Sequence, residues 1–389
     1  MNKAATLRFC KKTLAWASSA LLAGALFMPA PALGIVSVDD TELAQGENSV
    51  GGGTATLWDA ALDMMGVTAN TLYTDEDLQI GFEGGNDIGN VEVAGSAEVG
   101  MSFSGSNEVE EVHAHDNANV TINANGNNEF EEVEAHDRSN VTINVAGEND
   151  FEEISGNDDA NVTVRGTSCQ KKDVVNLGEG EEDSNLGTER GALTIDHVTL
   201  NLNAETTTVG SDKGDVVIDT SKIANTEDGQ NTLVNAGGKL LIRESVFDIA
   251  GTVHSSGDMT IDHSDVKVVK PDVEDEDLSP YRVWSEAGIE LINEKNGEVK
   301  DGKLGDKDVR YVDTDDGEDV DLKADGEPAY YRCKGDNGTD SDDGAASDDS
   351  QKRTTLPATS DGQGAAVVAL VLVGGAALHM SRKLRGKTA

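Results

Sequence analysis

The sequence is poor in basic residues, with 30 Lys and Arg against 73 Asp and Glu and a formal net charge of −43. A chain with this charge repels nucleic acid and other anionic polymers, so binding to a phosphate backbone is excluded as its main function. Two uses of the excess carboxylates fit better. They keep the protein solvated, or they bind a divalent cation such as Ca²⁺.

The sequence is also poor in cysteine, with Cys10, Cys169 and Cys333 alone. Cys10 lies in a segment that we expect to be removed, which leaves two cysteines far apart in the sequence. Two cysteines of an exported protein can form a disulfide, and a bridge between Cys169 and Cys333 would tie the middle of the chain to its C-terminal end. The sequence leaves open whether they pair.

Recognisable catalytic motifs are missing. There is no glycine-rich phosphate loop and no arrangement of Ser, His and Asp that predicts a nucleophilic catalyst. Between residues 76 and 166 the only basic residues are Arg138 and Arg165. Lys222 and Arg243 follow later with Asp219 nearby, but no spacing singles them out. The sequence therefore favours a protein that is not an enzyme.

Long apolar runs occur only at the two ends of the chain. At the N-terminus, Lys3, Arg8, Lys11 and Lys12 precede an apolar stretch at 13–27, and small residues at 29–34 follow it. This order is that of a secretory signal peptide. We expect residues 1–34 to be removed, with cleavage after position 32 or 34.

The C-terminal end carries a second targeting pattern. A pentapeptide precedes a polar spacer, an apolar run at 365–380 and a basic tail at 381–387. The pentapeptide consists of Leu356, Pro357, Ala358, Thr359 and Ser360. This order resembles the cell-wall sorting signal of Gram-positive surface proteins. In that family a sortase cuts after the Thr of an LPxTG motif and joins the new carboxyl end to peptidoglycan.

The resemblance implies an extracellular, wall-anchored protein whose partners are a sortase and peptidoglycan. An apolar run of about 16 residues is shorter than the roughly 20 needed to cross a bilayer. Such a run suits transient membrane insertion, with its basic end in the cytoplasm. Ser360 stands where the family has Gly, and a plain C-terminal membrane anchor is the alternative. Without residues 1–34 and 360–389 the chain keeps 22 basic and 72 acidic residues, a net charge of about −50.

A repeat of 21 residues fills the middle of the chain, with similar stretches that begin at Asn86, Asn107, Asn128 and Asn149. The apolar positions form columns, and glycines separate the units. The columns are Leu78, Val99, Val120, Val141 and Val162; Ile80, Met101, Ile122, Ile143 and Val164; Ile88, Val109, Phe130 and Phe151; and Val91, Val112, Val133 and Ile154; the glycines are Gly84, Gly105, Gly126 and Gly147.

Apolar and polar residues alternate within each unit, which is the period of a β-strand. A unit of 21 residues has the size of one rung of a parallel β-solenoid. A looser second set begins at Gly191, Gly214, Gly238 and Gly257, and its Ser221, Ser245 and Ser264 are expected at an inward corner. Together, residues 76–270 resemble the right-handed parallel β-helix of pectate-lyase-like proteins. We therefore predict an all-β, right-handed parallel β-helix of eight or nine rungs.

The same patterns give a division of the chain. An N-terminal cap at 35–75 includes a short amphipathic helix at 56–65, with Leu57, Ala61, Met64 and Met65 at helical spacing. Regular repeats occupy 76–166, an acidic insertion 167–190 and looser repeats 191–270. A small β cap or accessory domain follows at 271–333. An acidic stalk with almost no apolar residues at 334–355 is expected to be disordered and leads to the sorting signal at 356–389.

Acidic columns are the first candidate site. Their members are Glu110, Glu131 and Glu152 and, separately, Asp116, Asp137 and Asp158. Stacked one rung apart, they predict a Ca²⁺ site, and a solvated acidic face is the alternative.

Three further motifs have a structural alternative beside the functional one. His115 and His136 stand in register above Asn157, each beside an Asp, and predict either a transition-metal site or plain turn residues. Asn119, Asn140 and Asn161 predict a structural amide ladder. The segment 313–317 predicts a turn rather than a calcium loop.

The function expected from these observations is display of a stiff β-helix at the cell surface, for adhesion or carbohydrate binding without catalysis. The alternative is a surface polysaccharide lyase or glycosidase on the same fold.

Overall fold

A computed structural model describes residues 35–94, 97–167, 173–179, 181–226, 231–271, 280–314 and 319–332. The expected signal peptide, stalk and sorting signal lie outside the described residues, as do Cys169 and Cys333. No helix in these ranges is long and apolar enough to span a membrane. The described residues from Val36 onward belong to one compact unit.

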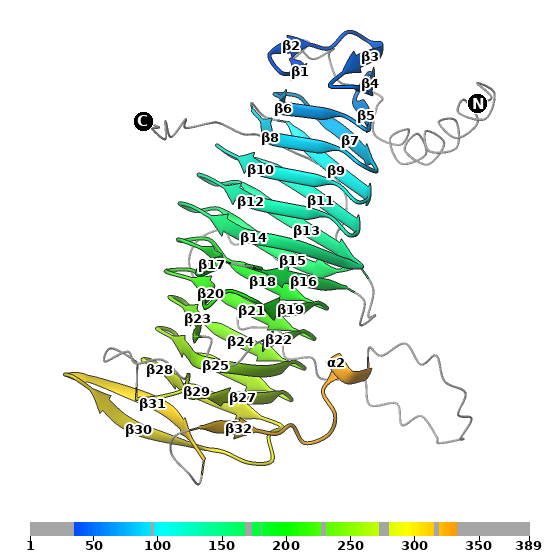
Figure 1. Ribbon diagram of the computed structural model, residues 1–389. Coiled ribbons are helices and arrows are strands. Elements are labelled where there is room, and N and C mark those ends of the chain that lie inside the picture. Colours follow the sequence, from blue (N-terminus) through cyan, green and yellow to red (C-terminus); the bar gives the residue numbers. More distant parts are fainter. Residues whose placement is uncertain are drawn as a thin grey trace, which may run out of the picture. The chain divides into compact units, whose positions relative to one another are not determined.

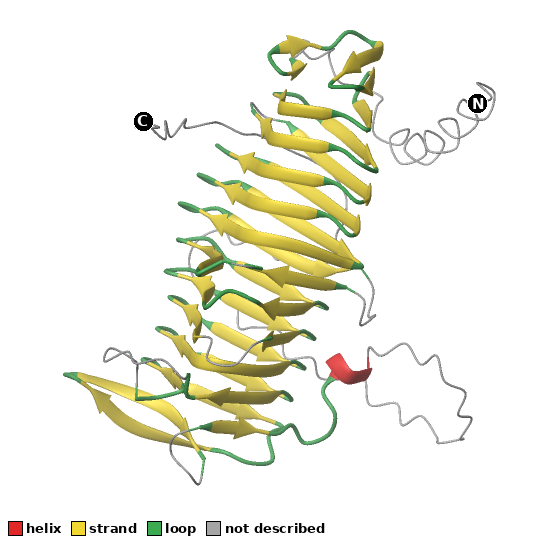
Figure 2. Ribbon diagram, viewed as in Figure 1, coloured by secondary structure: helices red, strands yellow, loops and turns green. Residues whose placement is uncertain are grey.

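This unit is a parallel β-solenoid of about nine turns, which confirms the predicted all-β fold and rung size (Figure 1). Strands of the described residues form two long sheets, and Figure 2 shows how little of the unit is helical. The thirteen-stranded sheet contains β3 (Gly46–Val50), β4 (Gly53–Trp58), β5 (Ala61–Met65), β7 (Leu78–Glu83), β9 (Glu98–Gly105), β11 (Asn119–Gly126), β13 (Asn140–Ala146), β15 (Asn161–Gly166), β18 (Leu193–Asp196), β21 (Val216–Asp219), β24 (Leu240–Arg243), β26 (Met259–Asp262) and β29 (Ile289–Ile292).

The nineteen-stranded sheet forms the rest of each turn. It contains β1 (Val36–Val38), β2 (Thr41–Glu42), β6 (Thr68–Thr74), β8 (Asp87–Val93), β10 (Glu108–Ala114), β12 (Glu129–Ala135), β14 (Glu148–Gly156), β16 (Val174–Leu177), β17 (Asp183–Thr188), β19 (Thr199–Leu202), β20 (Thr206–Ser211), β22 (Lys222–Asn225), β23 (Asn231–Ala236), β25 (Val246–Ser255), β27 (Asp265–Val269), β28 (Val283–Ser285), β30 (Glu298–Leu304), β31 (Lys307–Asp313) and β32 (Val320–Leu322). One short helix, α2 (Ala329–Arg332), follows β32.

The predicted apolar columns are the core. Val120 pairs with Val99 and Val141, and Val141 pairs with Val162. The column then continues without a break, because Val162 pairs with Leu193 in the second repeat set. Side chains one rung apart bury one another completely, and each contributes about 1.5–3 kcal/mol relative to exposure. The two repeat sets therefore share one core.

The nineteen-stranded sheet divides part-way along the solenoid. Residues 148–151 of β14 pair with β16, whereas residues 154–156 pair with β17. Each later turn then has two short strands on this side until β25, whose two ends pair with β22 and β23. The segment 167–190, expected as an acidic insertion, thus contributes β16 and β17 to the parallel stacking. The extra bend in each of these turns explains why the spacing of the second repeat set is less regular than 21 residues.

Left-handed residues make the corners between strands. Gly105, Gly126 and Gly147 have φ of 90°, 108° and 92°, and a Cβ on Gly126 would lie 2.7 Å from the carbonyl oxygen of Gly105. Glycine is required there because only it tolerates both the angle and the close approach. The glycines that separate the repeat units in the sequence thus lie at corners of the solenoid.

Asparagines brace the inside of the same corners. Asn86, Asn107, Asn128 and Asn149 are buried, and each Nδ2 donates to the Oδ1 of the next at 2.8 Å. The predicted ladder of Asn119, Asn140 and Asn161 is also present, with bonds of 2.8 and 2.9 Å, but it lies at the partly exposed start of β11, β13 and β15. The chain therefore has a buried amide ladder that the sequence analysis missed and an exposed one that it predicted.

The predicted N-terminal helix is wrong. Residues 56–65 form most of β4 and β5, which pair antiparallel before β5 joins the parallel stack through β7. Leu57, Leu62 and Met64 are buried, whereas Met65 is exposed. The apolar residues thus alternate with period two on either side of a turn at Asp59, and this pattern also fits the helical spacing that we used.

The segment 271–333, expected as a small β cap, contains both parallel and antiparallel strands. Strands β28 and β29 pair parallel with β25 and β26 and continue the solenoid. Strands β30 and β31 form an antiparallel hairpin that pairs with β28, and β32 pairs antiparallel with β27. Antiparallel strands end the parallel stack, which would otherwise present unpaired backbone groups at its edge.

The predicted inward serine corner ends on the half-buried carboxyl group of Glu294. Ser221, Ser245 and Ser264 are fully buried, and the Oγ of each later serine accepts from the N–H of the one before at 3.1 Å. The N–H of Ser264 donates to Glu294 Oε1 at 2.8 Å. The second oxygen, Oε2, is buried and has no hydrogen-bond partner among the described residues. Burial raises the pKa of Glu294 to about 7, against the lowering effect of the Ser264 N–H.

We expect Glu294 to make the stability pH-dependent. Since its pKa is near 4.5 in the unfolded chain and about 7 in the fold, its contribution to stability is present below pH 4.5 and is lost as the pH rises through 7. Because the group is partly exposed, the loss is about 1–3 kcal/mol. Glu294→Gln, which is neutral throughout, should remove this part of the pH dependence. Urea unfolding of both proteins between pH 5 and 8 measures it, and parallel profiles would contradict the assignment.

Candidate functional site

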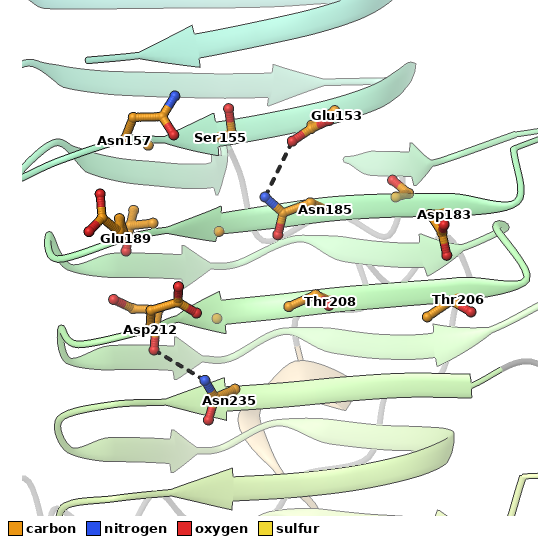
Figure 3. A pocket seen from close by; sticks show the side chains of 16 residues that line it. Glu153, Ser155, Asn157, Asp183, Asn185, Glu189, Thr206, Thr208, Asp212 and Asn235 are labelled. Atoms are coloured by element: carbon orange, nitrogen blue, oxygen red, sulfur yellow. Dashed lines mark hydrogen bonds between the residues drawn. The ribbon is translucent and has the colours of Figure 1, made fainter. Parts of the chain in front are cut away.

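A polar groove of about 460 Å³ crosses four strands of the nineteen-stranded sheet, β14, β17, β20 and β23 (Figure 3). Strands one rung apart are about 4.8 Å from each other, so the groove extends about 14 Å along the solenoid. Successive side chains of a strand point to opposite faces. Leu186 and Val209 face the core, and the residues next to them on the strands line the groove.

Small residues make the floor of the groove. Ser155, Gly187 and Gly210 occupy consecutive rungs in register. A Cβ on Gly210 would lie 1.9 Å from the carbonyl oxygen of Asn235, and one on Gly187 would lie 2.7 Å from Asn185 Oδ1. The floor is low because these two positions carry no side chain.

Larger polar residues make the two walls, as Figure 3 shows. One wall contains Glu153, Asn185 and Thr208, and the other contains Asn157, Glu189 and Asp212. The amide of Asn185 donates to Glu153 Oε1 at 3.4 Å across the rung. The walls are therefore two rows of hydroxyl, amide and carboxyl groups that face each other over a bare floor.

The charge of the groove is negative. Burial raises the pKa of Glu153, although the hydrogen bond from Asn185 lowers it. At the other wall, Lys213 Nζ lies 2.9 Å from Glu189 Oε1, and this hydrogen bond lowers the pKa of Glu189. None of the described residues that line the groove is basic. Such a surface offers many acceptors to hydroxyl or amino groups and repels anions.

The glutamate column predicted as a Ca²⁺ site, Glu110, Glu131 and Glu152, stacks from one rung to the next. Glu131 is exposed, and burial and then the charge of Glu110 raise its pKa. The same two kinds of cause raise the pKa of Glu152, whose neighbours include Glu181 and Glu131. The stacking predicted for this column is thus present, and Ca²⁺ binding by it stays a prediction that thermal melts with Ca²⁺ and with EDTA would test.

The second acidic column makes turns. Asp116, Asp137 and Asp158 are left-handed, with φ of 59°, 58° and 55°. The N–H of Asp116 donates to Asp137 Oδ2 at 2.9 Å, and Arg190 binds Asp158 at 2.9 Å. Asp adopts this conformation more readily than most residues, so turn formation alone accounts for the column.

Two other sequence candidates are placed by the structure. Arg243 forms an ion pair with Asp219 across β24 and β21, and this pairing raises the pKa of Arg243. At 313–317, Asp313 pairs with Lys300, and residues 315–317 lie outside the described part of the chain.

The histidines of the repeat do come together. The rings of His115 and His136 stack with centroids 4.4 Å apart and an interplanar angle of 8°. The amide of Asn157 lies 3.4 Å from His136 Nδ1, as the predicted column requires. His113 joins them, with its ring 5.9 Å from that of His115. The sequence analysis missed His113, and its signal was the spacing to His115, which places both near one end of a strand.

Carboxylates surround this cluster. Burial lowers the pKa of His113, but hydrogen bonds to Glu134 and Glu111 outweigh it and raise that pKa to about 9. The same bond from His113 and one from His136 lower the pKa of Glu134. Burial and the charge of Glu134 raise the pKa of Glu132 to about 7.

No known protein family, curated protein or solved structure matches this chain. Its class is therefore defined by the fold and the groove, as a parallel β-solenoid protein with an acidic, polar cleft on one sheet.

Proposed function

We propose that the chain is exported, joined to the peptidoglycan of a Gram-positive cell and displayed there, and that its groove binds a neutral or amino-bearing glycan without cleaving it. The leader at 1–34 and the sorting-type pattern at 356–389 support the address. The observation that carries the binding function is a cleft with many hydrogen-bonding groups and no basic residue in its described lining.

The chemistry of the groove limits the class of glycan that it can bind. An anionic polysaccharide would meet the carboxyl groups of Glu153, Asp183 and Asp212, and no residue of the described lining is basic. The charge of Glu189 is already paired with Lys213 outside the lining. Neutral sugars present hydroxyl groups that both donate and accept, and these match the mixed amide, hydroxyl and carboxyl walls. Amino sugars gain a charge-assisted bond as well.

Hydrolysis is the second candidate function, and a specific feature favours it. Glycosidases use a pair of carboxyl groups, one of them with a raised pKa, and Glu153 has a raised pKa in a cleft that also holds Asp183. Elimination by a lyase is supported less, because such enzymes combine acidic residues with a basic one.

A glycan array with the full chain tests the proposal, with a reducing-end assay on every glycan that binds. We expect binding to neutral or amino-bearing glycans and no release of reducing ends. Release of reducing ends would show that the protein hydrolyses the glycan, which contradicts binding without cleavage. Binding to uronic-acid polymers alone would contradict the proposed ligand class.

One variant tests whether the ligand binds in the groove. Asn185→Ala removes a wall amide and should weaken binding about 2- to 10-fold, the effect of one neutral hydrogen bond. Asn201→Ala is the matched control, since Asn201 on β19 bonds Asn176 in the same way but lies outside the groove. Titration of both variants with an array-selected glycan gives the two affinities. Equal losses would contradict the site.

The proposed attachment to peptidoglycan has a separate test. Digestion of peptidoglycan in cells that express the full chain should release the protein from the envelope. Protein that stays with the membrane after digestion would show a plain membrane anchor instead of sortase attachment.

A further inference from the structure

Three histidines form a compact cluster on the turn that links β10 and β12 to the thirteen-stranded sheet. His113 lies in β10, and His115 and His136 occupy the same corner on successive rungs. One ring nitrogen from each lies within 4.8 Å of those of the other two. His115 is only 5% exposed, and the side chains of His113 and His136 are 16% and 20% exposed. The cluster is thus mostly shielded from water.

The register explains why the cluster is local. His113 pairs with Glu92 on one side and with Glu134 on the other, so a single histidine interrupts a column of acidic residues. In the neighbouring column, the residue below His136 is Asn157, and no third histidine follows. Only the two rungs of β10 and β12 therefore supply all three imidazoles.

Carboxylates hold the rings in place. Glu134 Oε2 lies 3.0 Å from His113 Nδ1 and 3.0 Å from His136 Nε2, and Glu111 Oε2 lies 2.9 Å from His113 Nε2. Both ring nitrogens of His113 therefore face a carboxylate, and a metal ion bound to one of them would replace one of these two contacts. Carboxylates behind imidazole rings are the usual outer shell of histidine metal sites.

The geometry suits a small divalent ion. Metal–nitrogen bonds of about 2.0–2.1 Å in a tetrahedron put the ligand atoms roughly 3.3 Å apart. The three nitrogens lie within 4.8 Å of one another, so a bound ion would draw them together by at most about 1.5 Å. Imidazole nitrogen favours zinc, copper and nickel, whereas Ca²⁺ and Mg²⁺ take oxygen ligands.

We propose that His113, His115 and His136 bind one divalent transition metal ion, with Zn²⁺ as the best match, and that Glu134 is a positioning residue for two of the rings. The ion cross-links two rungs of the solenoid. None of the three proposed ligands lines the groove, although Asn157 of the groove wall lies 3.4 Å from His136 Nδ1. The metal site therefore borders the groove but needs no groove residue as a ligand.

Zinc titration of the metal-free full chain tests the site. We expect one tight ion per chain, retained in a large excess of Ca²⁺, because diffuse binding to an acidic surface would be displaced by Ca²⁺. At zinc concentrations a hundredfold above Kd, the melting temperature should rise by about 5–10 °C. Absence of a tight site in the unmodified chain, or its loss in excess Ca²⁺, would overturn the proposal.

Matched variants assign the ligands. His136→Asn copies the residue that the next rung carries at this position, Asn157, so the fold should tolerate it, and zinc affinity should fall at least about 100-fold. His197→Asn is the control, since His197 is left-handed with φ of 57° and Asn tolerates that angle. Glu134→Gln should weaken binding about 10- to 100-fold. Unchanged affinity in His136→Asn, with the fold intact by circular dichroism, would contradict the assignment.

Discussion

Replacement of Phe130 by alanine is expected to lower the free energy of unfolding by about 3–5 kcal/mol. Phe130 is fully buried in β12. Its ring stacks on Phe151 with centroids 4.8 Å apart and meets Phe103 edge-on at 5.0 Å. The change would open a cavity between three rungs, and a β-solenoid cannot collapse around it without losing its strand register.

Urea unfolding measures this loss, and Phe130→Leu is the control. Leucine keeps most of the volume, so it should cost less than about 1.5 kcal/mol. Because each rung contacts only its neighbours, hydrogen exchange should accelerate in β10 to β14 more than in β21 to β26. A uniform change along the chain, or a loss below 1 kcal/mol, would contradict the core described here.

Replacement of Asn128 by alanine is expected to cost about 2–4 kcal/mol. Asn128 Oδ1 accepts from Asn107 at 2.8 Å, and its Nδ2 donates to Asn149 at 2.8 Å. The change leaves one N–H of the buried Asn107 amide without its acceptor and removes one donor to the Oδ1 of Asn149. Each unsatisfied buried group costs about 1–3 kcal/mol.

The chain supplies a matched comparison for this prediction. Asn140 bonds Asn119 and Asn161 in the same ladder geometry but is exposed. Water replaces its lost bonds, so Asn140→Ala should cost about 1 kcal/mol or less. Chemical denaturation of the two variants gives the difference. Similar costs for both would show that the buried ladder does not stabilise the corner.

The strand positions and the length of each rung were predictable because the apolar residues recur at a fixed spacing. The columns of Val120 and Ile122 fixed both the strand period and the rung length, and the structure pairs them as expected. The glycine corners followed from the same repeat. The predicted helix at 56–65 failed because Leu57 and Ala61 lie on two strands joined by a turn, and neighbouring strands rather than local spacing decide such a short segment.

The groove could not be predicted, because it depends on residues without a constant spacing. Ser155, Gly187 and Gly210 come into register only after the sheet divides at β14. His113 escaped notice for a related reason, since the equivalent residues of the adjacent rungs are glutamates. A regular repeat predicts the residues of the core, whereas both candidate binding sites lie where the sequence of one rung differs from that of its neighbours.

Hydrogen–deuterium exchange of the full chain, with and without a glycan selected on the array, tests the central claim most directly. The account predicts slower exchange in β14, β17, β20 and β23, the strands that form the groove, and no change in the thirteen-stranded sheet. Protection confined to other strands, or binding without protection at the groove, would contradict it.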